Sequence, residues 1–593
     1  MPKMPAMHRP LVSLLLAALL APAAYALDQP EAATTRTAKQ GSLTVPARHF
    51  AVTAANPLAV QAGAEILKAG GSAMDAAIAV QAVLSLVEPQ SSGIAGGAFL
   101  MHWDGRQVQA LDGRETAPAA ATPALFLRPD GRPLAMRDAI LSGLATGTPG
   151  VLAMLAEGHR LHGRLPWARL FEPAIRLAEQ GFAISPRLFE LFSAEAALRN
   201  DPQAAPYFFD AAGNPKPVGT LLKNPAYAAV LRGIAKQGVR GFYEGPVAED
   251  IVRRVRGHAR PGLLTTADLA AYKPVVRPPM CNDWRSWRIC GFGPPTSGHL
   301  TLMQILGLLD TQPAAVAARG ITADWMHAYA ESAKLAFADR AQFIGDPAFV
   351  TAPGGDWQTL LAPPYLKQRG ALIGAKVMAT ATAGQPGTVV QALAPQAEQL
   401  ESGTSHVSII DAQGHAVAMT TSVESAFGNR VMSDGGTGLP GGFMLNNQLT
   451  DFSLNPVGPD GRPVANRVEA GKRPRSSMAP TLVFDHDGQL LMVAGSPGGP
   501  VIIHYMAKLL TGALAWGLPV QQAVDLPNFG HFNTGSLIVE RGALTAAQLS
   551  ELRGRGHHVV ETDLTSGLQV LMHVKGGWAG GADPRREGIV KGE

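Results

Sequence analysis

The chain has 593 residues, of which 46% are hydrophobic and 16% charged, and its formal net charge is +4. This length is ample for a large packed core. Lysine and arginine are scattered without runs and aromatic residues are sparse, which argues against a nucleic-acid-binding face. Two cysteines are too few for a disulfide-based scaffold.

The N-terminus has the pattern of a cleavable secretory signal. Lys3 and Arg9 precede an apolar run at 11–20, and a small-residue Ala-Tyr-Ala exit stands at 24–26. The run has about half of the roughly 20 residues that a bilayer core requires, so removal of residues 1–26 is expected rather than a membrane anchor. Removal takes away two basic residues and no acidic one, and the net charge becomes 4 − 2 = +2. We expect a periplasmic or secreted protein.

Helix signals follow at the start of the mature chain. Asn56 before Pro57 combines a cap with a first-turn proline and predicts a helix to about Lys68. Ser72 and Asp75 have the spacing of a capping box and predict a second helix that ends before residue 89. Both helices are expected to cover a core.

A β-hairpin is predicted next. Apolar runs at 98–103 and 106–111 flank an Asp-Gly turn, and Arg114 stands just past the second run. Short apolar runs, glycine and alanine continue through the rest of the chain without a clear interdomain linker. We therefore expect one mixed α/β body rather than several domains.

The two cysteines flank a stretch that fits another hairpin. Cys281 and Cys290 enclose Trp-Arg-Ser-Trp-Arg at 284–288. An exported protein would permit a disulfide here, and two small buried apolar residues are an equally good interpretation. Neither interpretation gives the cysteines a catalytic role.

One segment has the composition of an exposed linker. Residues 379–403 are rich in alanine, glycine, glutamine and proline and show little apolar periodicity. Two β-type runs, at 405–411 and 415–423, come directly after it. The linker therefore leads into the start of a strand.

The junction between linker and strand holds a candidate nucleophile. Gly403 can adopt backbone conformations closed to other residues, which lets the Thr404 hydroxyl reach the preceding carbonyl. An N-to-O acyl shift and hydrolysis would make Thr404 a new N-terminus. Its α-amine, with a pKa of about 7.7 to 8.0, could then act as general base for its own hydroxyl. Taken alone, such a junction more often marks only a turn.

A glycine-rich turn offers candidate oxyanion donors. An apolar strand run at 490–494 is followed by Gly-Ser-Pro-Gly-Gly at 495–499 and by a helix pattern from Pro500. Unpaired amides at a helix N-terminus can hold an oxyanion, and one such donor is worth about 3 to 4 kcal/mol of transition-state stabilisation. Taken alone, this pattern more often marks a strand-to-helix turn.

Several motifs together resemble the gamma-glutamyltransferase family, in that family's order, from about residue 45 to the end. They are Ser-Gly-Ile-Ala-Gly-Gly at 92–97, Arg-Glu-Thr-Ala-Pro at 114–118, Thr-Ser-His-Val-Ser at 404–408, Asn-Asn-Gln-Leu-Thr-Asp-Phe-Ser at 446–453, Arg-Pro-Arg-Ser-Ser-Met at 473–478 and the turn at 495–499. Several motifs in the right order are far more specific than any one of them.

The resemblance implies a fold and a mode of maturation. It implies an α/β (α+β) protein with the four-layer αββα sandwich of N-terminal nucleophile hydrolases. It also implies autocatalytic cleavage at Gly403–Thr404 into a large chain, 27–403, and a small catalytic chain, 404–593, which remain together as one body. The reaction would transfer a γ-glutamyl group from glutathione or a similar amide to water or to an amino acid or peptide, without cofactor or metal.

The resemblance also implies roles for individual residues. Thr404 would be the nucleophile, Ser422 a hydroxyl that hydrogen-bonds it, and Gly498 and Gly499 the oxyanion donors. The substrate-binding residues form two groups. Arg114, Ser476 and Ser477 would hold the α-carboxylate. Glu424, Gln448 and Asp451 would bind the α-amine.

Three departures from the family pattern bear on these roles. Ser422 stands where a threonine is usual, and Glu424 replaces an asparagine and should strengthen recognition of an ammonium group. Being two apart, Ser422 and Glu424 are expected on one face of one strand. The loop at 453–475, where relatives often carry a lid, is shorter and lacks aromatic residues, so hydrolysis could outrun transfer.

Other signals are rejected, and two rival functions remain open. The G-x-G-x-x-G at 436–441 precedes a strand run rather than a helix, so we expect a loop. His406 is expected to be packed or hydrogen-bonded on the strand face opposite to Thr404. One rival is an acylase for glutaryl or cephalosporin side chains, whose substrate lacks the α-amine. The other is an exported binding protein without catalysis, and its mature chain would stay intact.

Overall fold

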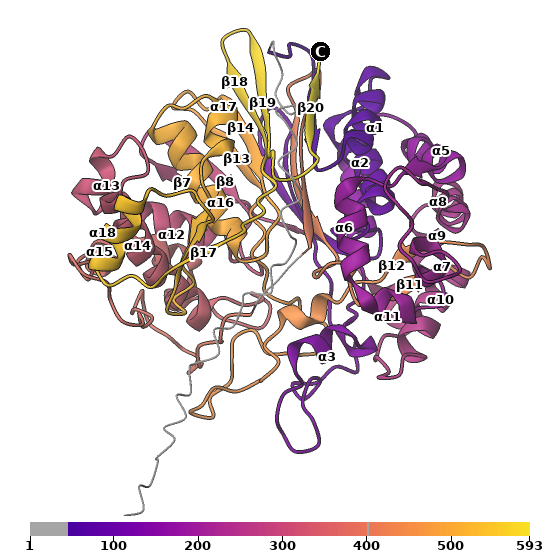
Figure 1. Ribbon diagram of the computed structural model, residues 1–593, viewed down its shortest axis with the longest axis horizontal. Helices are drawn as coiled ribbons and strands as arrows, with labels where there is room; N and C mark the ends of the chain where they lie inside the picture. The colour runs from indigo at the N-terminus through magenta and orange to yellow at the C-terminus, as the bar shows by residue number, and fades with distance from the viewer. Residues whose placement is uncertain (1–45, 400–402) are drawn as a thin grey trace, which may run out of the picture.

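The structure is a computed structural model that describes residues 46–399 and 403–593. Two β-sheets lie face to face in the centre, with helices against both outer faces (Figure 1). The predicted αββα sandwich is therefore confirmed. The predicted signal segment, 1–26, lies outside the described residues. Within the described residues, no helix is long and apolar enough to cross a membrane.

The first sheet places strands from both ends of the chain side by side. Its described strands, in spatial order, are β20 (Ile589–Gly592), β1 (Ala51–Ala54), β9 (Thr404–Ile410), β10 (Ala416–Ser422), β2 (Gly97–Trp103), β3 (Val108–Gly113) and β6 (Val275–Arg277). All these pairs are antiparallel. Strands from both sides of the Gly403–Thr404 bond are therefore interleaved in one sheet.

The second sheet is also antiparallel and mixes the two parts of the chain. Its described strands, in order, are β19 (Gly577–Ala582), β18 (Gln569–Val574), β14 (Leu490–Gly495), β13 (Thr481–Phe484), β8 (Trp287–Gly291) and β7 (Met280–Trp284). β13, which follows residue 403 in the sequence, pairs with β8, which precedes it. Cutting at residue 403 would thus leave two interleaved chains held by strand pairing.

Helices cover the outer face of each sheet. The principal helices on the first sheet are α1 (Pro57–Lys68), α2 (Ala73–Val87), α4 (Val151–His162), α5 (Glu172–Gln180), α8 (Pro225–Gln237) and α10 (Gly245–Arg256). Those on the second are α12 (Gly298–Asp310), α14 (Ala323–Phe343), α16 (Val501–Leu510) and α18 (Ala546–Gly554).

Shorter elements complete the described fold. The helices are α3 (Met136–Ile140), α6 (Pro186–Ala194), α7 (Ala204–Phe208), α9 (Arg240–Tyr243), α11 (Thr266–Ala271), α13 (Pro313–Ala317), α15 (Pro363–Gly370) and α17 (Val520–Asp525). The strands are β4 (Phe182–Ala183), β5 (Leu221–Leu222), β11 (Met432–Ser433), β12 (Phe443–Met444), β15 (Phe529–Gly530), β16 (Leu537–Glu540) and β17 (Val559–Thr562).

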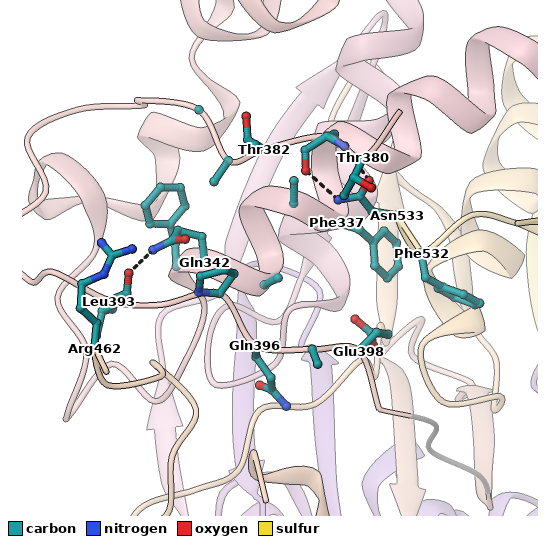
Figure 2. A pocket seen from close by; sticks show the side chains of 18 of the residues that line it. Phe337, Gln342, Thr380, Thr382, Leu393, Gln396, Glu398, Arg462, Phe532 and Asn533 are labelled. Atoms are coloured by element: carbon teal, nitrogen blue, oxygen red, sulfur yellow. Dashed lines mark hydrogen bonds between the residues drawn. The ribbon is translucent and has the colours of Figure 1, made fainter. Parts of the chain in front are cut away.

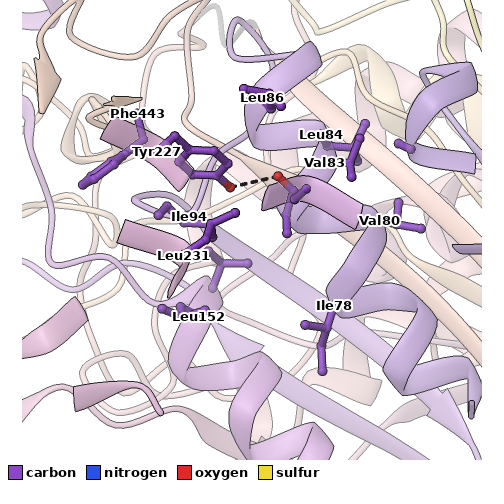
Figure 3. Packing of buried hydrophobic residues seen from close by; sticks show 14 of the residues in the cluster. Ile78, Val80, Val83, Leu84, Leu86, Ile94, Leu152, Tyr227, Leu231 and Phe443 are labelled. Atoms are coloured by element: carbon purple, nitrogen blue, oxygen red, sulfur yellow. Dashed lines mark hydrogen bonds between the residues drawn. The ribbon is translucent and has the colours of Figure 1, made fainter. Parts of the chain in front are cut away.

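The predicted helix caps at Asn56 and Ser72 are confirmed. The Asn56 side chain accepts from the Leu58 amide, and Ser72 and Asp75 form a reciprocal capping box before α2. Every residue of α2 is buried, because the helix lies between the first sheet and the outer helices. Figure 3 shows part of this core, where the Tyr227 hydroxyl donates to the Ala82 carbonyl at 2.8 Å.

The predicted hairpins are also confirmed. β2 and β3 pair around the Asp-Gly turn, and Arg114 directly follows β3. β7 and β8 form the second hairpin, in which Cys281 and Cys290 are opposite each other and joined by a disulfide. The structure thus selects the disulfide from the two interpretations left open. Residues 436–441 form a loop before β12, as expected.

The segment before the cleavage position is less exposed than predicted. Its described part, 379–399, has no helix or strand, as expected. However, Leu393, Ala394 and Gln396 are buried, because the chain here packs on α14 and on the loop at 453–475. The prediction of an exposed linker is therefore wrong for Leu393, Ala394 and Gln396.

Candidate active site

Thr404 is the first residue of β9, and its hydroxyl belongs to a short chain of hydrogen bonds. Thr404 lies opposite Ser422, the last residue of β10, and its Oγ1 donates to Ser422 Oγ at 3.2 Å. The Ser422 hydroxyl donates in turn to the carbonyl oxygen of Gly403. It also accepts from the Glu424 amide at 2.8 Å. Ser422 therefore links the candidate nucleophile to the carbonyl of the bond that would be cut.

Gly403 is held in a conformation that favours glycine. Its φ is +100°, in the left-handed region. A Cβ atom built on it would lie 2.7 Å from the Glu424 carbonyl oxygen and 2.9 Å from the Ser425 carbonyl carbon. Close approach to this backbone therefore excludes a side chain here, independently of the φ value.

A small pocket gathers most of the predicted site residues. Its lining residues are Thr404, Ser422, Glu424, Gln448, Asp451, Ser476, Met478 and Ile502. The space open to water is only about 10 Å³, which is room for about one water molecule. Six of the predicted site residues thus surround a space that is too small for a substrate.

Free acceptor atoms face this pocket. One Asp451 carboxylate oxygen bonds to Arg114 and accepts from Gln448 Nε2 at 2.7 Å. In the described part of the chain, Asp451 Oδ1 and Gln448 Oε1 are buried without a hydrogen-bond partner. Burial raises the pKa of the Asp451 carboxyl, and Arg114 opposes that shift. Unpaired buried acceptors of this kind suit a cationic ligand.

Glu424 reaches the same pocket by a route that the sequence pattern did not predict. β10 ends at Ser422, and Glu424 has a φ of +78°. The expectation of two residues on one strand face is therefore wrong. The Glu424 carboxylate instead accepts from the Asn447 side-chain amide and, at 3.3 Å, from the Thr450 hydroxyl.

Arg114 and Ser477 lie behind the pocket rather than in its lining. Arg114 is fully buried and donates to Asp451 and, at 3.2 and 3.1 Å, to the carbonyls of Pro474 and Arg475. The Ser477 hydroxyl accepts from Arg340 at 2.8 Å. In the unprocessed chain, Ser476 is thus the member of the predicted carboxylate-binding group that lines the pocket.

The two glycines of the predicted oxyanion site precede α16. Gly498 and Gly499 have φ values of +130° and +55°. Neither amide donates a hydrogen bond within the described residues. Ile502, in the first turn of α16, lines the pocket. The N-terminal end of α16, with its two free donors, therefore adjoins the pocket.

His406 is hydrogen-bonded, as predicted, but it is on the same strand face as Thr404. It lies opposite Thr420 and contacts the Thr420 and Ser408 hydroxyls at 2.8 and 3.1 Å. Residues two apart on a strand share a face, so the expected opposite orientation is wrong. Burial lowers the pKa of His406 to about 3, so it is neutral at ordinary pH.

The structure adds contacts with no signal in the sequence. Arg586, far along the chain, donates to the Thr404 carbonyl at 3.1 Å. Both carboxylate oxygens of Glu398 accept hydrogen bonds from Arg340 Nη1. The other terminal nitrogen of Arg340 donates to the Ser477 hydroxyl. Isolated arginines outside any motif do not stand out in a sequence, and only the packing of distant segments identifies them.

Glu398 also borders a second cavity. This cavity, of about 800 Å³, lies between α14, the segment at 380–398 and the loop containing Phe532 and Asn533 (Figure 2). Gln342 of α14 donates to the Leu393 carbonyl at 2.6 Å across it. The segment before the cleavage position is thus anchored at several points beside a large open space.

The αββα sandwich, with a threonine at the start of an inner strand, defines the class of N-terminal nucleophile hydrolases. The gamma-glutamyltranspeptidase family model matches residues 59–593, and the chain belongs to that family. It is 34% identical over 555 residues to the glutathione hydrolase proenzyme of Escherichia coli (strain K12), covering 91% of each chain.

Solved structures of two kinds resemble this fold. Cephalosporin acylase from Bacillus halodurans has a TM-score of 0.79 at 27% identity, over 94% of this chain and 98% of that one. Gamma-glutamyltranspeptidase from Helicobacter pylori has a TM-score of 0.51 at 30% identity, over 60% of this chain and 97% of that one.

Proposed function

We propose that this protein is a γ-glutamyl hydrolase and transferase that matures by cutting its Gly403–Thr404 bond and then uses Thr404 as its nucleophile. The observation that carries the proposal is the hydrogen-bonded series from Thr404 through Ser422 to the Gly403 carbonyl, beside a pocket with unpaired acceptors. Membership of the gamma-glutamyltranspeptidase family supports it.

The first reaction is the cut itself. The Thr404 hydroxyl oxygen adds to the Gly403 carbonyl carbon, and the Ser422 hydroxyl, which donates to that carbonyl oxygen, stabilises the developing negative charge. The C–N bond then breaks as the proton lost by the Thr404 hydroxyl passes to the nitrogen, which leaves an ester on Thr404 and a free α-amine. Water hydrolyses the ester, which restores the hydroxyl and leaves a carboxylate on Gly403.

Turnover then uses both groups of the new N-terminal residue. The α-amine takes the proton of the Thr404 hydroxyl as its oxygen attacks the γ-carbonyl of the substrate. Gly498 and Gly499 precede α16, whose Ile502 lines the pocket, and their amides would donate to the oxyanion. The proton passes to the leaving amine, and a γ-glutamyl ester remains. Water or an acceptor amine then releases the γ-glutamyl group.

The polar pocket supports recognition of an amino acid rather than a plain acyl group. Asp451 Oδ1 and Gln448 Oε1 are unpaired acceptors among the described residues, and the Glu424 carboxylate lines the same pocket. Together they suit the α-ammonium group of a γ-glutamyl substrate. Ser476, backed by Arg114, would hold the α-carboxylate.

An acylase for glutaryl-type side chains is the alternative, and the structural resemblance to cephalosporin acylase supports it. A glutaryl group has no α-amine. It would leave Asp451 Oδ1 and Gln448 Oε1, the acceptors that are buried and unpaired within the described residues, without a donor, which is costly. The γ-glutamyl proposal is therefore preferred.

Two measurements test the proposal. The purified mature protein should give two chains on a denaturing gel, with a new N-terminus Thr-Ser-His-Val, and Thr404→Ala should remain one inactive chain. The processed protein should hydrolyse a chromogenic γ-glutamyl anilide faster than the matching glutaryl anilide. An uncut but folded parent chain would contradict the mechanism, and a preference for the glutaryl compound would support the acylase instead.

A further inference from the structure

We propose that Arg586 is a positioning residue for Thr404 and that, after cleavage, its guanidinium disfavours the protonated form of the Thr404 α-amine. The inference rests on the proposed function, because it concerns the amine that cleavage releases. It adds a residue from the C-terminal end of the chain to the machinery around the nucleophile.

The end of β9 needs support beyond its strand partners. β1 pairs with β9 only as far as Val407, opposite Ala54, whereas β10 continues to Thr404. The first residues of β9 therefore have a strand partner on one side only. After cleavage Thr404 would also lose its covalent link to Gly403, and chain ends fray unless other contacts hold them.

Arg586 supplies such a contact. Its guanidinium donates to the Thr404 carbonyl at 3.1 Å and to the Thr565 carbonyl at 3.4 Å. The side chain is buried and packs on Gly567, where a Cβ atom would lie 2.7 Å from Arg586 Cδ. The Arg586 guanidinium is thus fixed between the segment that leads into β18 and the candidate nucleophile.

The same position has an electrostatic consequence. The carbonyl oxygen and the amine nitrogen of Thr404 belong to one residue, so they are only about 3 to 4 Å apart. A buried positive charge bound to that oxygen is therefore close to the new amine. Because the guanidinium and a protonated amine would both be positively charged, this closeness favours the neutral amine. The neutral amine is the form that can accept a proton.

Other groups around Thr404 also affect the pKa of its α-amine, and substitution of Arg586 leaves them in place. The Glu424 and Asp451 carboxylates line the pocket, and their negative charges favour the protonated amine. The positive charge of Arg114 partly offsets the charge of Asp451. His406, on the same strand face, is neutral, as burial lowers its pKa to about 3. Tyr505 contacts Gly498 and stays neutral because burial raises its pKa. Arg586 therefore opposes the two carboxylates.

The test compares Arg586→Gln and Arg586→Lys with the parent full-length protein. It measures the rate of chain cutting, and the pH profile of kcat/KM for a γ-glutamyl anilide per titrated active site. Arg541→Gln is the matched control, since it removes an arginine of the same chain that forms an exposed ion pair with Asp563.

In Arg586→Gln, cutting should slow by about tenfold. The acid limb of kcat/KM should move up by about one pH unit, because the amine pKa rises when the positive charge is lost. Arg586→Lys should keep the limb near its parental position, and Arg541→Gln should match the parent throughout.

An unchanged acid limb in the processed Arg586→Gln protein would overturn the inference. So would failure of both Arg586 variants to fold, judged by circular dichroism, because Arg586 would then be a residue of the fold alone. A folded Arg586→Gln chain that stays uncut while Arg586→Lys matures would support the positioning role. If the parent itself is not cut, the proposed function fails, and the two failures are therefore distinguishable.

Discussion

The hydroxyl of Ser422 lies between the hydroxyl of Thr404 and the carbonyl oxygen of Gly403, accepting from the first and donating to the second. This relationship depends on register, because β9 and β10 pair Thr404 with Ser422 directly. A shift by one residue would point the serine to the other face of the sheet. The pairing of two inner strands thus positions the cleavage chemistry.

Removal of the Ser422 hydroxyl should slow maturation. Ser422→Ala loses the donor to the Gly403 carbonyl, and we expect the cutting rate to fall by about 100-fold, as for other oxyanion donors. Ser422→Thr keeps the hydroxyl and should mature. Ser405→Ala is the control, since its buried Oγ has no hydrogen-bond partner in the described chain. A time course on denaturing gels measures the rates, and equal cutting in Ser422→Ala and Ser405→Ala would refute the role.

A side chain at Gly403 should prevent the cut. Gly403→Ala places a methyl group 2.7 Å from the Glu424 carbonyl oxygen at a φ of +100°. Gly414→Ala is the matched control, since Gly414 has a φ of +77° but nothing within 4 Å of the added Cβ. We expect one chain for Gly403→Ala and two for Gly414→Ala by intact mass. Two chains in both would show that close packing at Gly403 is not needed.

Asp451 should determine the preference for an α-amine. Asp451→Asn removes the charge but keeps a similar shape, and kcat/KM for a γ-glutamyl anilide should fall by about tenfold to 100-fold. Turnover of a glutaryl anilide should not fall to the same extent, because that substrate has no α-amine. The ratio of the two rates on one preparation cancels any loss of folded protein. An unchanged ratio would remove Asp451 from amine recognition.

Glu115 should make the folded chain less stable as the pH rises. Burial raises the pKa of Glu115 from 4.5 to about 8, although Arg114 opposes the shift. Between these values the folded chain binds more protons at this site than the unfolded chain, so stability falls as the pH rises, by up to about 1.4 kcal/mol per pH unit.

Thermal unfolding between pH 5 and pH 8 checks this behaviour. The Thr404→Ala background keeps the chain uncut, and Glu115→Gln in that background removes the titrating group. We expect the decline in Tm toward pH 8 to be shallower in Glu115→Gln. Parallel curves for the two proteins would show that Glu115 ionises normally.

Two of the wrong predictions share a cause, whereas the one for His406 contradicts the simple alternation of a strand. Glu424 was expected on the strand of Ser422, but the chain leaves the strand with a positive φ and returns to the pocket through contacts with Asn447 and Thr450. The sequence predicts an exposed segment at 393–396, but Leu393, Ala394 and Gln396 are buried, and the Gln396 amide donates to the Ala341 carbonyl of α14. In both cases contacts between distant segments override a local pattern.

The sequence by itself determined the features that depend on near neighbours along the chain. The cap at Asn56, the capping box at Ser72, the hairpin at β2 and β3 and the glycine before Thr404 follow from local backbone chemistry, and motif order indicated the family. Only the tertiary structure decided that the pocket is closed before cleavage, that Arg114 lies behind Asp451 and that Arg586 holds the Thr404 carbonyl. The two contacts join residues that are 337 and 182 positions apart, and only the packing of distant segments brings them together.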